Sequence, residues 1–541
     1  MNIIKKITLL GVTLTSASAL LACSSISSEG ASESDWQTEN ENYENENSSQ
    51  EDSEGESGFA VSKDYGDKTQ EALWDLSNVF NDYRESAMAD PVRQMEVTPV
   101  SKTLSTTSGE SDPYDICTIE MNGRRMQYTM EIIGEPDDEG MYPLYITMHG
   151  GGESTAEENN EQWIAMMNYY RDSVQNGIYV AVRGMEDVWN MHFLEDSYPM
   201  YDRLIEDMIL LENADPNRVY LLGFSAGGDG VYAVAPRMAD RFAAVNMSSG
   251  HPNDVSLLNL SNLPIEIQVG IRDYYSASAK RSLRGAEFED ILNGYSEAFG
   301  FGYSHRVLVH VPQGHGINDN YVVNDEFIEE YGLQDEDPAK LYPHVLKHPE
   351  EFARRAEDED WLSAFMNILE EVSGKTSCSE LSYESPDGLD DKLFEYVTND
   401  LNMEVVEERD TDAVHYVNDY QREPLPQSFI WDLGTRADSR NDNAFYWLKA
   451  DKSVNQGVIE AVFDKENNTV YLDEIDDVNG EITILANPLM MDFDRPLTVQ
   501  TPNEEITVDL KPDKKIMEES VKETGDFNLA WADEVTVSLN K

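Results

Sequence analysis

A serine between two glycines follows a short apolar run near the middle of the chain. The run is Val219–Leu222, and the pentapeptide Gly223-Phe224-Ser225-Ala226-Gly227 comes directly after it. A strand that ends in G-x-S-x-G forces the serine into a strained turn, which presents its hydroxyl above a sheet, within reach of a histidine. We therefore predict that Ser225 is a nucleophile and that the backbone N–H of Ala226 donates to an oxyanion.

A glycine-rich segment ends an earlier predicted strand. Its sequence, Met148-His149-Gly150-Gly151-Gly152, matches the HGGG type of oxyanion loop, in which glycines allow the backbone to approach a substrate closely. Gly151 is the favoured second oxyanion donor, and Gly150 is the alternative. A glycine-rich turn without a catalytic role also stays open. We expect His149 to fix the loop rather than to transfer a proton.

An acid and a histidine follow later predicted strands, in the chain order Ser…Asp…His that such a site requires. Asp273 ends one strand, and Asp254 and Asp290 are weaker candidates for the same role. His315 lies between two glycines after the last strand, on a loop that suits a base. A surface acid and a structural histidine are the alternatives. Together with Ser225, these residues predict a catalytic triad.

No metal or other cofactor is expected at this site. The triad supplies its own base, and no cluster of histidine, cysteine and acidic residues in the sequence has metal-ligand spacing.

Residues 113 to about 370 resemble α/β-hydrolases of the polyhydroxybutyrate depolymerase and feruloyl-esterase-like group. The segments that carry the resemblance are Met148–Gly152, Asp215–Gly228, Gly270–Asp273 and Gly314–Gly316. The resemblance implies ester hydrolysis through an acyl-enzyme, and we expect carbohydrate-linked or polymeric carboxylic esters as substrates. The chain departs from this group in its acidic N-terminal segment, its extra C-terminal region and its lack of the cysteine pairs of some secreted members. The acyl and alcohol parts of the substrate therefore stay open.

Alternating strands and helices must position these residues. The predicted strands are Ile116–Met121, Met126–Ile133, Leu144–Met148, Ile178–Val182, Val219–Gly223, Ala243–Met247, Ile265–Gly270 and Val307–Val311. The predicted helices are Thr69–Arg84, Glu157–Tyr170, Tyr201–Leu211 and Gly227–Ala235. Asn122-Gly123 predicts a hairpin between the first two strands. This pattern is typical of an α/β domain with a mostly parallel sheet.

Short strands divided by turns dominate after Gly374, which predicts an all-β accessory domain, a sandwich. Its predicted strands are Gly457–Asp464, Thr469–Asp473, Ile482–Ala486, Leu497–Gln500, Ile506–Leu510 and Val535–Leu539. We expect the aromatic residues around Trp431 and Trp447 to pack its core, and a carbohydrate platform is the alternative. Because the triad precedes Gly374, we expect hydrolysis of a small ester to survive without this domain.

Four side chains lie in segments that we expect to face the mouth of the site. They are candidate substrate contacts: Trp163, Arg183, Trp189 and His192. Arg183 follows the end of a predicted strand, where ligand contacts gather in open α/β sheets. An ion pair with a nearby acid is the alternative for Arg183.

The first residues resemble a bacterial lipoprotein signal. Lys5 and Lys6 precede the apolar stretch Ile7–Ala22, and Leu20–Cys23 resembles a lipobox. The stretch is short for a membrane span. An ordinary signal peptide or a short membrane anchor is the alternative. The resemblance implies cleavage before Cys23 and a diacylglyceryl group on its sulfur, which would hold the protein on the outer face of the cytoplasmic membrane and be its only membrane attachment.

The 541-residue chain carries 105 acidic and 39 basic residues, a formal net charge of −66. Such a surface repels nucleic acid and anionic lipid, so we expect neither as a partner. The segment Ser24–Gly58 has almost no aliphatic side chains and is expected to be a flexible tether. The predicted organisation is a signal peptide at 1–22, an acidic tether at 23–68, a catalytic α/β-hydrolase domain at 69–375 and the accessory domain at 376–541.

The sequence leaves several points open. Cys117 and Cys378 could form a disulfide or stay as two thiols. A serine peptidase on the same core, or a non-catalytic surface-binding lipoprotein, are alternatives to a serine esterase. Nothing in the sequence indicates the oligomeric state.

Overall fold

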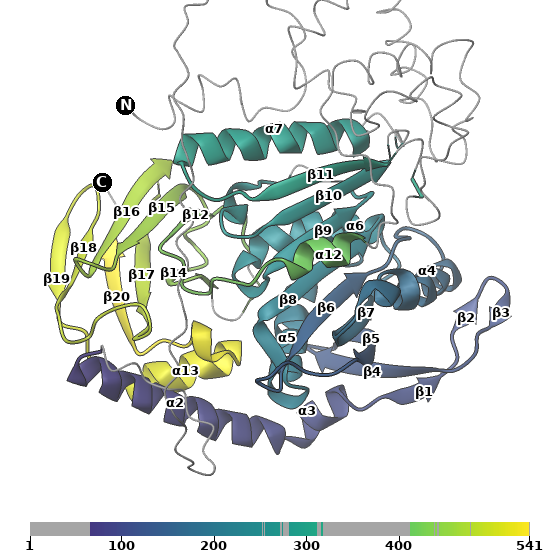
Figure 1. Cartoon of the computed structure of the whole chain (residues 1–541), viewed down its shortest axis with the longest axis horizontal. Helices are drawn as coiled ribbons and strands as arrows, with labels where there is room; N and C mark the ends of the chain where they lie inside the picture. The colour runs from purple at the N-terminus through teal and green to yellow at the C-terminus, as the bar shows by residue number, and fades with distance from the viewer. Residues whose placement is uncertain are drawn as a thin grey trace, which may run out of the picture.

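The computed structural model describes residues 65–251, 253, 255–270, 273, 281–310, 315–316, 412–437, 439–440, 443–476 and 478–539 (Figure 1). The predicted signal peptide, Cys23 and nearly all of the tether lie outside these residues, as does Cys378. Cys117 is a free, buried thiol, and burial raises its pKa to about 11. Among the described helices, none is both long and apolar enough to cross a membrane.

A nine-stranded sheet forms the centre of the larger part of the molecule. Its strands lie in the order β1 (Val100–Lys102), β4 (Tyr114–Met121), β5 (Arg124–Ile133), β7 (Gly177–Arg183), β6 (Tyr142–Met148), β8 (Ala214–Phe224), β9 (Ala244–Ser248), β10 (Ile265–Gly270) and β11 (His305–His310). The strands from β7 to β11 run parallel to one another, whereas β1, β4 and β5 pair antiparallel. This arrangement is the α/β-hydrolase fold, and it confirms the predicted fold class.

The leading hairpin turns at the predicted dipeptide. Asn122 and Gly123 join β4 to β5, and both have positive φ, 52° and 75°. A two-residue turn of this kind matches the right-handed twist of the strands, because both central residues are left-handed. A second, small hairpin, β2 (Ser105–Thr106) and β3 (Gly109–Glu110), lies outside the main sheet.

Helices cover both faces of the sheet, because its central strands are buried on both sides. On β6, Leu144 and Ile146 join one buried cluster with helices α5 (Ser197–Leu211), α6 (Ala226–Val234) and α7 (Arg281–Phe299). Tyr145, between them, points to the opposite face and joins the cluster of α4 (Ala156–Tyr169). The predicted helices are confirmed, and α7 is an addition to them.

A helix from far along the chain completes the second face. It is α12 (Asp412–Asn418), whose Ala413, Val414 and Val417 are fully buried against β8, β9 and β10. Figure 1 shows α12 lying across the middle of the large sheet. The predicted domain boundary at residue 375 stays a prediction, but a segment beyond it covers the sheet of the catalytic part.

The C-terminal region contains two sheets that share one core. The five-stranded sheet is β12 (Ser428–Asp432), β15 (Val458–Asp464), β16 (Thr469–Asp476), β18 (Leu497–Gln500) and β19 (Glu505–Val508). The four-stranded sheet is β13 (Ala444–Phe445), β14 (Leu448–Ala450), β17 (Glu481–Ala486) and β20 (Asp533–Ser538). The predicted strands are confirmed, but the region is not all-β, because it includes helix α13 (Lys514–Thr524).

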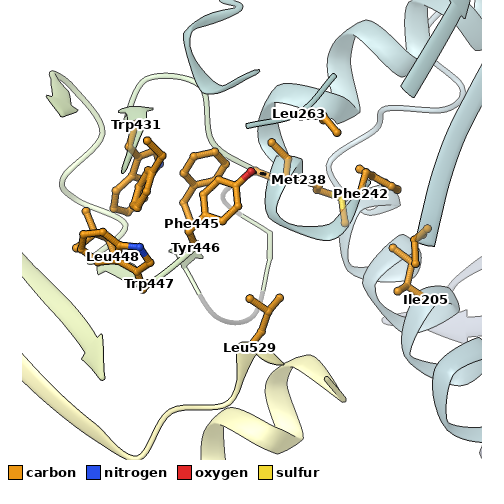
Figure 2. Packing of buried hydrophobic residues seen from close by; sticks show 14 of the residues in the cluster. Ile205, Met238, Phe242, Leu263, Trp431, Phe445, Tyr446, Trp447, Leu448 and Leu529 are labelled. Atoms are coloured by element: carbon orange, nitrogen blue, oxygen red, sulfur yellow. Dashed lines mark hydrogen bonds between the residues drawn. The ribbon is translucent and has the colours of Figure 1, made fainter. Parts of the chain in front are cut away.

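The aromatic side chains of this region pack its core (Figure 2). Trp431 on β12 stacks on Phe445 of β13 with ring centroids 5.9 Å apart. Trp447 is fully buried, and its indole N–H donates to the carbonyl oxygen of Pro426 over 2.8 Å. No face of either indole is open to a sugar, so the alternative of a carbohydrate platform is wrong.

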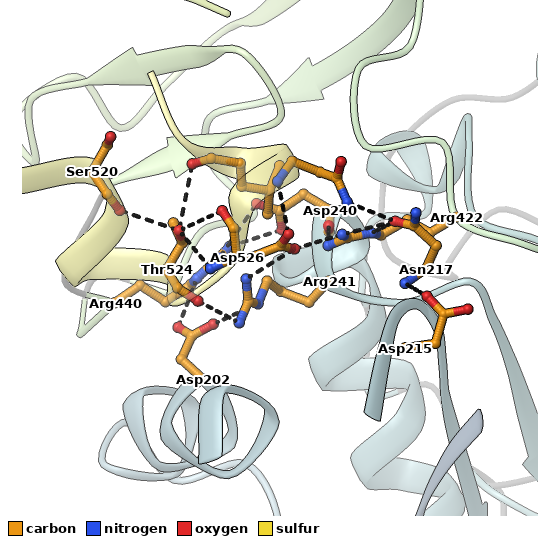
Figure 3. Close-up of polar contacts among 12 residues, drawn as sticks. Asp202, Asp215, Asn217, Asp240, Arg241, Arg422, Arg440, Ser520, Thr524 and Asp526 are labelled. Carbon is orange, nitrogen blue, oxygen red and sulfur yellow. Dashed lines mark hydrogen bonds and ion pairs between the residues drawn. The ribbon is translucent and has the colours of Figure 1, made fainter. Parts of the chain in front are cut away.

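The two parts share a polar, buried interface (Figure 3). Arg422 of the C-terminal region donates to the Asp240 carbonyl oxygen over 3.0 Å, and Arg440 lies 3.0 Å from Asp240, measured from Nη1 to Oδ1. Arg241, on the catalytic side, donates to the carbonyl oxygen of Thr524 in α13 over 3.2 Å. All three guanidinium groups are buried.

Helix α2 (Asp67–Met88) also belongs to both parts, and a short helix α3 (Pro91–Glu96) follows it. Helix α2 packs along α13 of the C-terminal region and against α5 of the catalytic part (Figure 1). The ring of Phe80 on α2 meets that of Phe527 edge to face, with centroids 5.6 Å apart. The sequence therefore folds into two sheet systems that one long helix and a buried ionic interface hold together.

Candidate active site

Ser225 occupies a strained turn between β8 and α6. Its φ of 58° and ψ of −119° lie outside the regions that non-glycine residues prefer. The glycines on either side are required by the close backbone. A Cβ on Gly223 would lie 2.2 Å from the carbonyl oxygen of Gly227, and one on Gly227 would lie 2.0 Å from that of Met148. The Ser225 N–H donates to the carbonyl oxygen of Ser248 over 2.9 Å, which fixes the turn to β9.

A hydrogen-bonded chain connects Ser225, His315 and Asp273. The Nε2 atom of His315 lies 2.8 Å from Ser225 Oγ, and its Nδ1 lies 2.9 Å from Asp273 Oδ2. Because a carboxylate only accepts, Nδ1 carries the proton, and Nε2 is left to accept the serine proton. The structure thus brings together three residues that are distant in sequence. Asp254 and the side chain of Asp290 lie outside the described residues.

The carboxylate of Asp273 is fully buried at the end of β10. Arg281, at the start of α7, lies 3.5 Å from its Oδ1, measured from Nη1, and donates its backbone N–H to the Asp273 carbonyl oxygen over 3.0 Å. One oxygen of Asp273 therefore faces a guanidinium and the other faces the imidazole. This arrangement holds the carboxylate in the orientation that His315 needs.

The glycine-rich loop after β6 lies against the nucleophile. A Cβ on Gly150 would lie 3.2 Å from Ser225 Cβ, and Gly151 has a φ of 106° that favours glycine. The Gly152 N–H is occupied, because it donates to Asn159 Oδ1 over 3.0 Å. No acceptor for the Gly151 N–H occurs among the described residues. Gly151 remains the favoured donor, and Gly150 remains the alternative.

Ala226 begins helix α6, so its N–H has no partner within the helix. It directly follows the nucleophile, as the second oxyanion donor of an elbow does. The positive end of the α6 dipole adds to its attraction for a developing negative charge.

His149 and His192 form a buried pair beneath this loop. His149 Nε2 accepts the Gly184 N–H over 3.0 Å, so its Nδ1 carries the proton and donates to the Gly150 carbonyl oxygen over 2.5 Å. His192 Nε2 donates to the His149 carbonyl oxygen over 2.9 Å. Burial lowers the pKa of both, that of His192 to about 4. Both imidazoles therefore stay neutral and support the loop.

Three of the four candidate substrate contacts are not at the mouth of the site. His192 is 1% exposed, so that prediction is wrong. The prediction for Trp163 is also wrong, because this residue of α4 is fully buried and its indole N–H donates to the Ala181 carbonyl oxygen over 2.9 Å. Arg183 is buried and ion-paired to Asp187 over 2.5 Å, which confirms the alternative reading of that residue.

Trp189 remains a candidate contact. Its side chain is 51% exposed, and its Cα lies 3.6 Å from the position that a Cβ on Gly152 would take. The indole meets the ring of Phe193 edge to face, with centroids 5.3 Å apart. This places an exposed aromatic surface beside the glycine-rich loop.

Two features of the site escaped the sequence analysis. Phe224 and Tyr169 form an aromatic group beside the catalytic histidine. The centroid of the Phe224 ring lies 5.4 Å from that of His315 and 5.2 Å from that of Tyr169. Asn159 holds the glycine-rich loop through its amide. Phe224 stands in the pentapeptide itself, so its position was available as a signal, whereas nothing in the sequence singled out Asn159.

In the part of the chain that the structure describes, no group of three or more histidine, cysteine or acidic side chains could hold a metal ion.

Comparison with known proteins gives likenesses of structure alone. No family model matches the chain, and no curated protein matches it. Similar solved structures include a thermostable esterase (TM-score 0.29, 16% identity, 39% of this chain and 62% of that one). A poly(3-hydroxybutyrate) depolymerase from Bordetella parapertussis has a TM-score of 0.30 and 16% identity over 42% of this chain and 88% of that one. An acetyl xylan esterase from Aspergillus awamori has a TM-score of 0.28 and 12% identity over 40% of this chain and 99% of that one.

Proposed function

We propose that the protein is a serine esterase that hydrolyses carboxylic esters through an acyl-enzyme. The observation that carries this proposal is the hydrogen-bonded chain from Ser225 through His315 to Asp273. A nucleophile, a base, an orienting acid and oxyanion donors are the full set that acyl transfer requires.

The chemistry follows from the geometry. His315 Nε2 takes the proton of Ser225 as Oγ bonds to the ester carbonyl carbon, and the N–H groups of Gly151 and Ala226 donate to the resulting oxyanion. The C–O bond to the alcohol then breaks, and His315 returns its proton to the leaving oxygen. A water molecule repeats the sequence on the acyl-enzyme, releases the acid and restores Ser225. Asp273 holds the imidazole and stabilises its charged form throughout.

We propose carbohydrate-linked or polymeric esters as the substrate class. The resemblance of the motifs to polyhydroxybutyrate depolymerases and feruloyl esterases supports this, and so does the exposed indole of Trp189 beside the glycine-rich loop. An indole face offers a flat apolar surface on which a sugar or phenyl ring can stack.

A substrate panel tests the reaction class. We expect release of product from p-nitrophenyl acetate and methyl ferulate, and much slower cleavage of peptide p-nitroanilides of matched acyl size. Faster cleavage of the peptide amides would favour the serine peptidase. Absence of turnover on all of them, in a folded protein, would favour the non-catalytic surface protein.

We also propose that a lipid on Cys23 anchors the protein outside the cytoplasmic membrane. One acyl chain binds a bilayer only marginally, and a diacylglyceryl thioether supplies two. Cys23→Ser should release the protein from the membrane fraction or block its processing. Membrane retention of the processed Cys23→Ser protein would contradict the anchor. Serine has nearly the same shape as cysteine and lacks only the sulfur that carries the lipid, so the change isolates that atom.

A further inference from the structure

The side chain of Asn159 makes four hydrogen bonds around the glycine-rich loop. Its Oδ1 accepts the Gly152 N–H over 3.0 Å and the Ser154 hydroxyl over 3.1 Å. Its Nδ2 donates to the Gly152 carbonyl oxygen over 2.9 Å and to Asp187 Oδ1 over 2.8 Å. Asn159 is fully buried, and both atoms of its amide group are engaged in these bonds to the loop and to Asp187. A buried amide satisfied in this way holds its partners firmly.

The position of Asn159 is itself fixed from two directions. It lies in the first turn of α4, where Thr155 and Glu158 form a capping box that anchors the start of the helix. On the other side, Asp187 accepts a hydrogen bond from Asn159 Nδ2 and is ion-paired to Arg183. Burial opposes ionisation of Asp187, but hydrogen bonds from Arg183 and Asn159 outweigh it and lower its pKa.

The hydrogen bonds exclude one amide of the loop as an oxyanion donor. The Gly152 N–H is bound to Asn159 and cannot donate to an oxyanion at the same time. The Asn159 Oδ1 atom would lie 2.3 Å from a Cβ on Gly151, so no residue with a side chain fits at this position of positive φ. The backbone is thereby held with no acceptor for the Gly151 N–H among the described residues, directly after Gly150, whose Cβ position lies 3.2 Å from Ser225 Cβ.

We propose that Asn159 is the positioning residue of the oxyanion loop, and that Asp187 and Arg183 hold it in register. Asn159 does not touch the reacting atoms; it removes the Gly152 N–H as a donor and fixes the backbone that carries the candidate donors Gly151 and Gly150. This inference rests on the proposed serine esterase activity, in which the oxyanion exists. It adds a chain of contacts from the partly buried Arg183–Asp187 ion pair to the glycine-rich loop.

Asn159→Leu tests the inference, because leucine has a similar volume and makes none of the four hydrogen bonds. The matched control is Asn168→Leu, on an exposed position of the same helix. We expect Asn159→Leu to lower kcat on p-nitrophenyl acetate by about 10- to 100-fold while KM stays within about twofold, because a misplaced donor weakens binding of the transition state alone. Asn168→Leu should behave as the wild type.

A second readout does not depend on activity. Hydrogen–deuterium exchange of the peptide covering residues 148–155 should be faster in Asn159→Leu than in Asn168→Leu, because the Gly152 N–H loses its acceptor. Where Asn159→Leu fails to fold, Asp187→Ala carries the test from the more exposed end of this chain of contacts, with a smaller loss of kcat in the same direction.

The outcomes separate the two proposals. A kcat for Asn159→Leu within about twofold of the control overturns the positioning role, as does a change confined to KM. An inactive wild type overturns the esterase proposal instead, and exchange at residues 148–155 then decides the role of Asn159. Equal exchange in both variants would overturn it.

Discussion

Replacement of Arg422 by alanine should destabilise the whole molecule, because it removes the closest charged partner of the buried Asp526 carboxylate. Arg422 bonds Asp526 over 2.5 Å, and it also donates to the Asp240 carbonyl oxygen over 3.0 Å and to Asn217 Oδ1 over 3.1 Å. After its removal, the nearest guanidinium to Asp526 in the described part is Arg241, 3.9 Å away. Breaking one side of such a buried pair costs about 3–5 kcal/mol.

That loss is a large fraction of the roughly 5–15 kcal/mol by which a typical domain is stable. At a urea m-value of about 3 kcal/mol/M, the unfolding midpoint should fall by about 1–2 M. Circular dichroism during urea titration measures it, since urea does not screen charges. The loss should persist in 1 M NaCl, because salt screens buried pairs weakly.

Arg124→Ala is the matched control, since Arg124 forms its ion pairs with Glu186 and Asp196 at the exposed surface. It should leave the midpoint unchanged. The double variant Arg422→Ala/Asp526→Ala should lose less than the sum of its single changes, because it buries no unpaired charge. A midpoint for Arg422→Ala equal to that of Arg124→Ala would refute the reasoning, as would two separate transitions in the wild type.

Three further results are expected. His315→Ala should lower kcat by about 10⁶-fold and Asp273→Asn by about 10⁴-fold, since the acid only orients the base; equal, small losses would argue against these roles. Burial raises the pKa of Asp207 to about 8, with the nearby Arg203 opposing it. Protonation of Asp207 therefore stabilises the folded protein in full below about pH 4, and this stabilisation is lost as pH rises to about 8. Asp207→Asn, which mimics the protonated acid, should gain in urea midpoint relative to the wild type between pH 5 and 8, and a constant difference would contradict this. A chain that ends at Lys375 lacks α12 and the C-terminal half of the interface, so it should aggregate; a soluble, active product would show that the catalytic part folds alone.

The sequence predicted the elements and the chain order of the site because those signals are local. Leu144–Met148 is a short, mostly apolar run, and Ile265–Gly270 alternates apolar with polar residues; both patterns are typical of strands. The pentapeptide around Ser225 and the glycine-rich loop encode tight backbone contacts, and glycine alone satisfies those. Each of these features could be read without knowledge of the rest of the chain.

Features that depend on tertiary packing could not be predicted in the same way. Trp163 and His192 lie close in sequence to the mouth of the site, but the direction of each side chain is set by how its segment packs. Helix α12 has too short an apolar pattern to indicate that it covers a distant sheet. Helix α13 is different, because its buried Met517, Ser520, Val521 and Thr524 follow a helical spacing that was present in the sequence.

The most direct test of the central claim is covalent labelling of Ser225. A fluorophosphonate reacts with an activated serine, expels fluoride and forms a phosphonate ester on Oγ. Intact-mass and peptide mass spectrometry should find one adduct, on the peptide containing Ser225, and Ser225→Ala should take up none while keeping the circular dichroism spectrum of the wild type. Absence of an adduct on the folded wild type, or an equal adduct on Ser225→Ala, would contradict the assignment of Ser225 as the nucleophile.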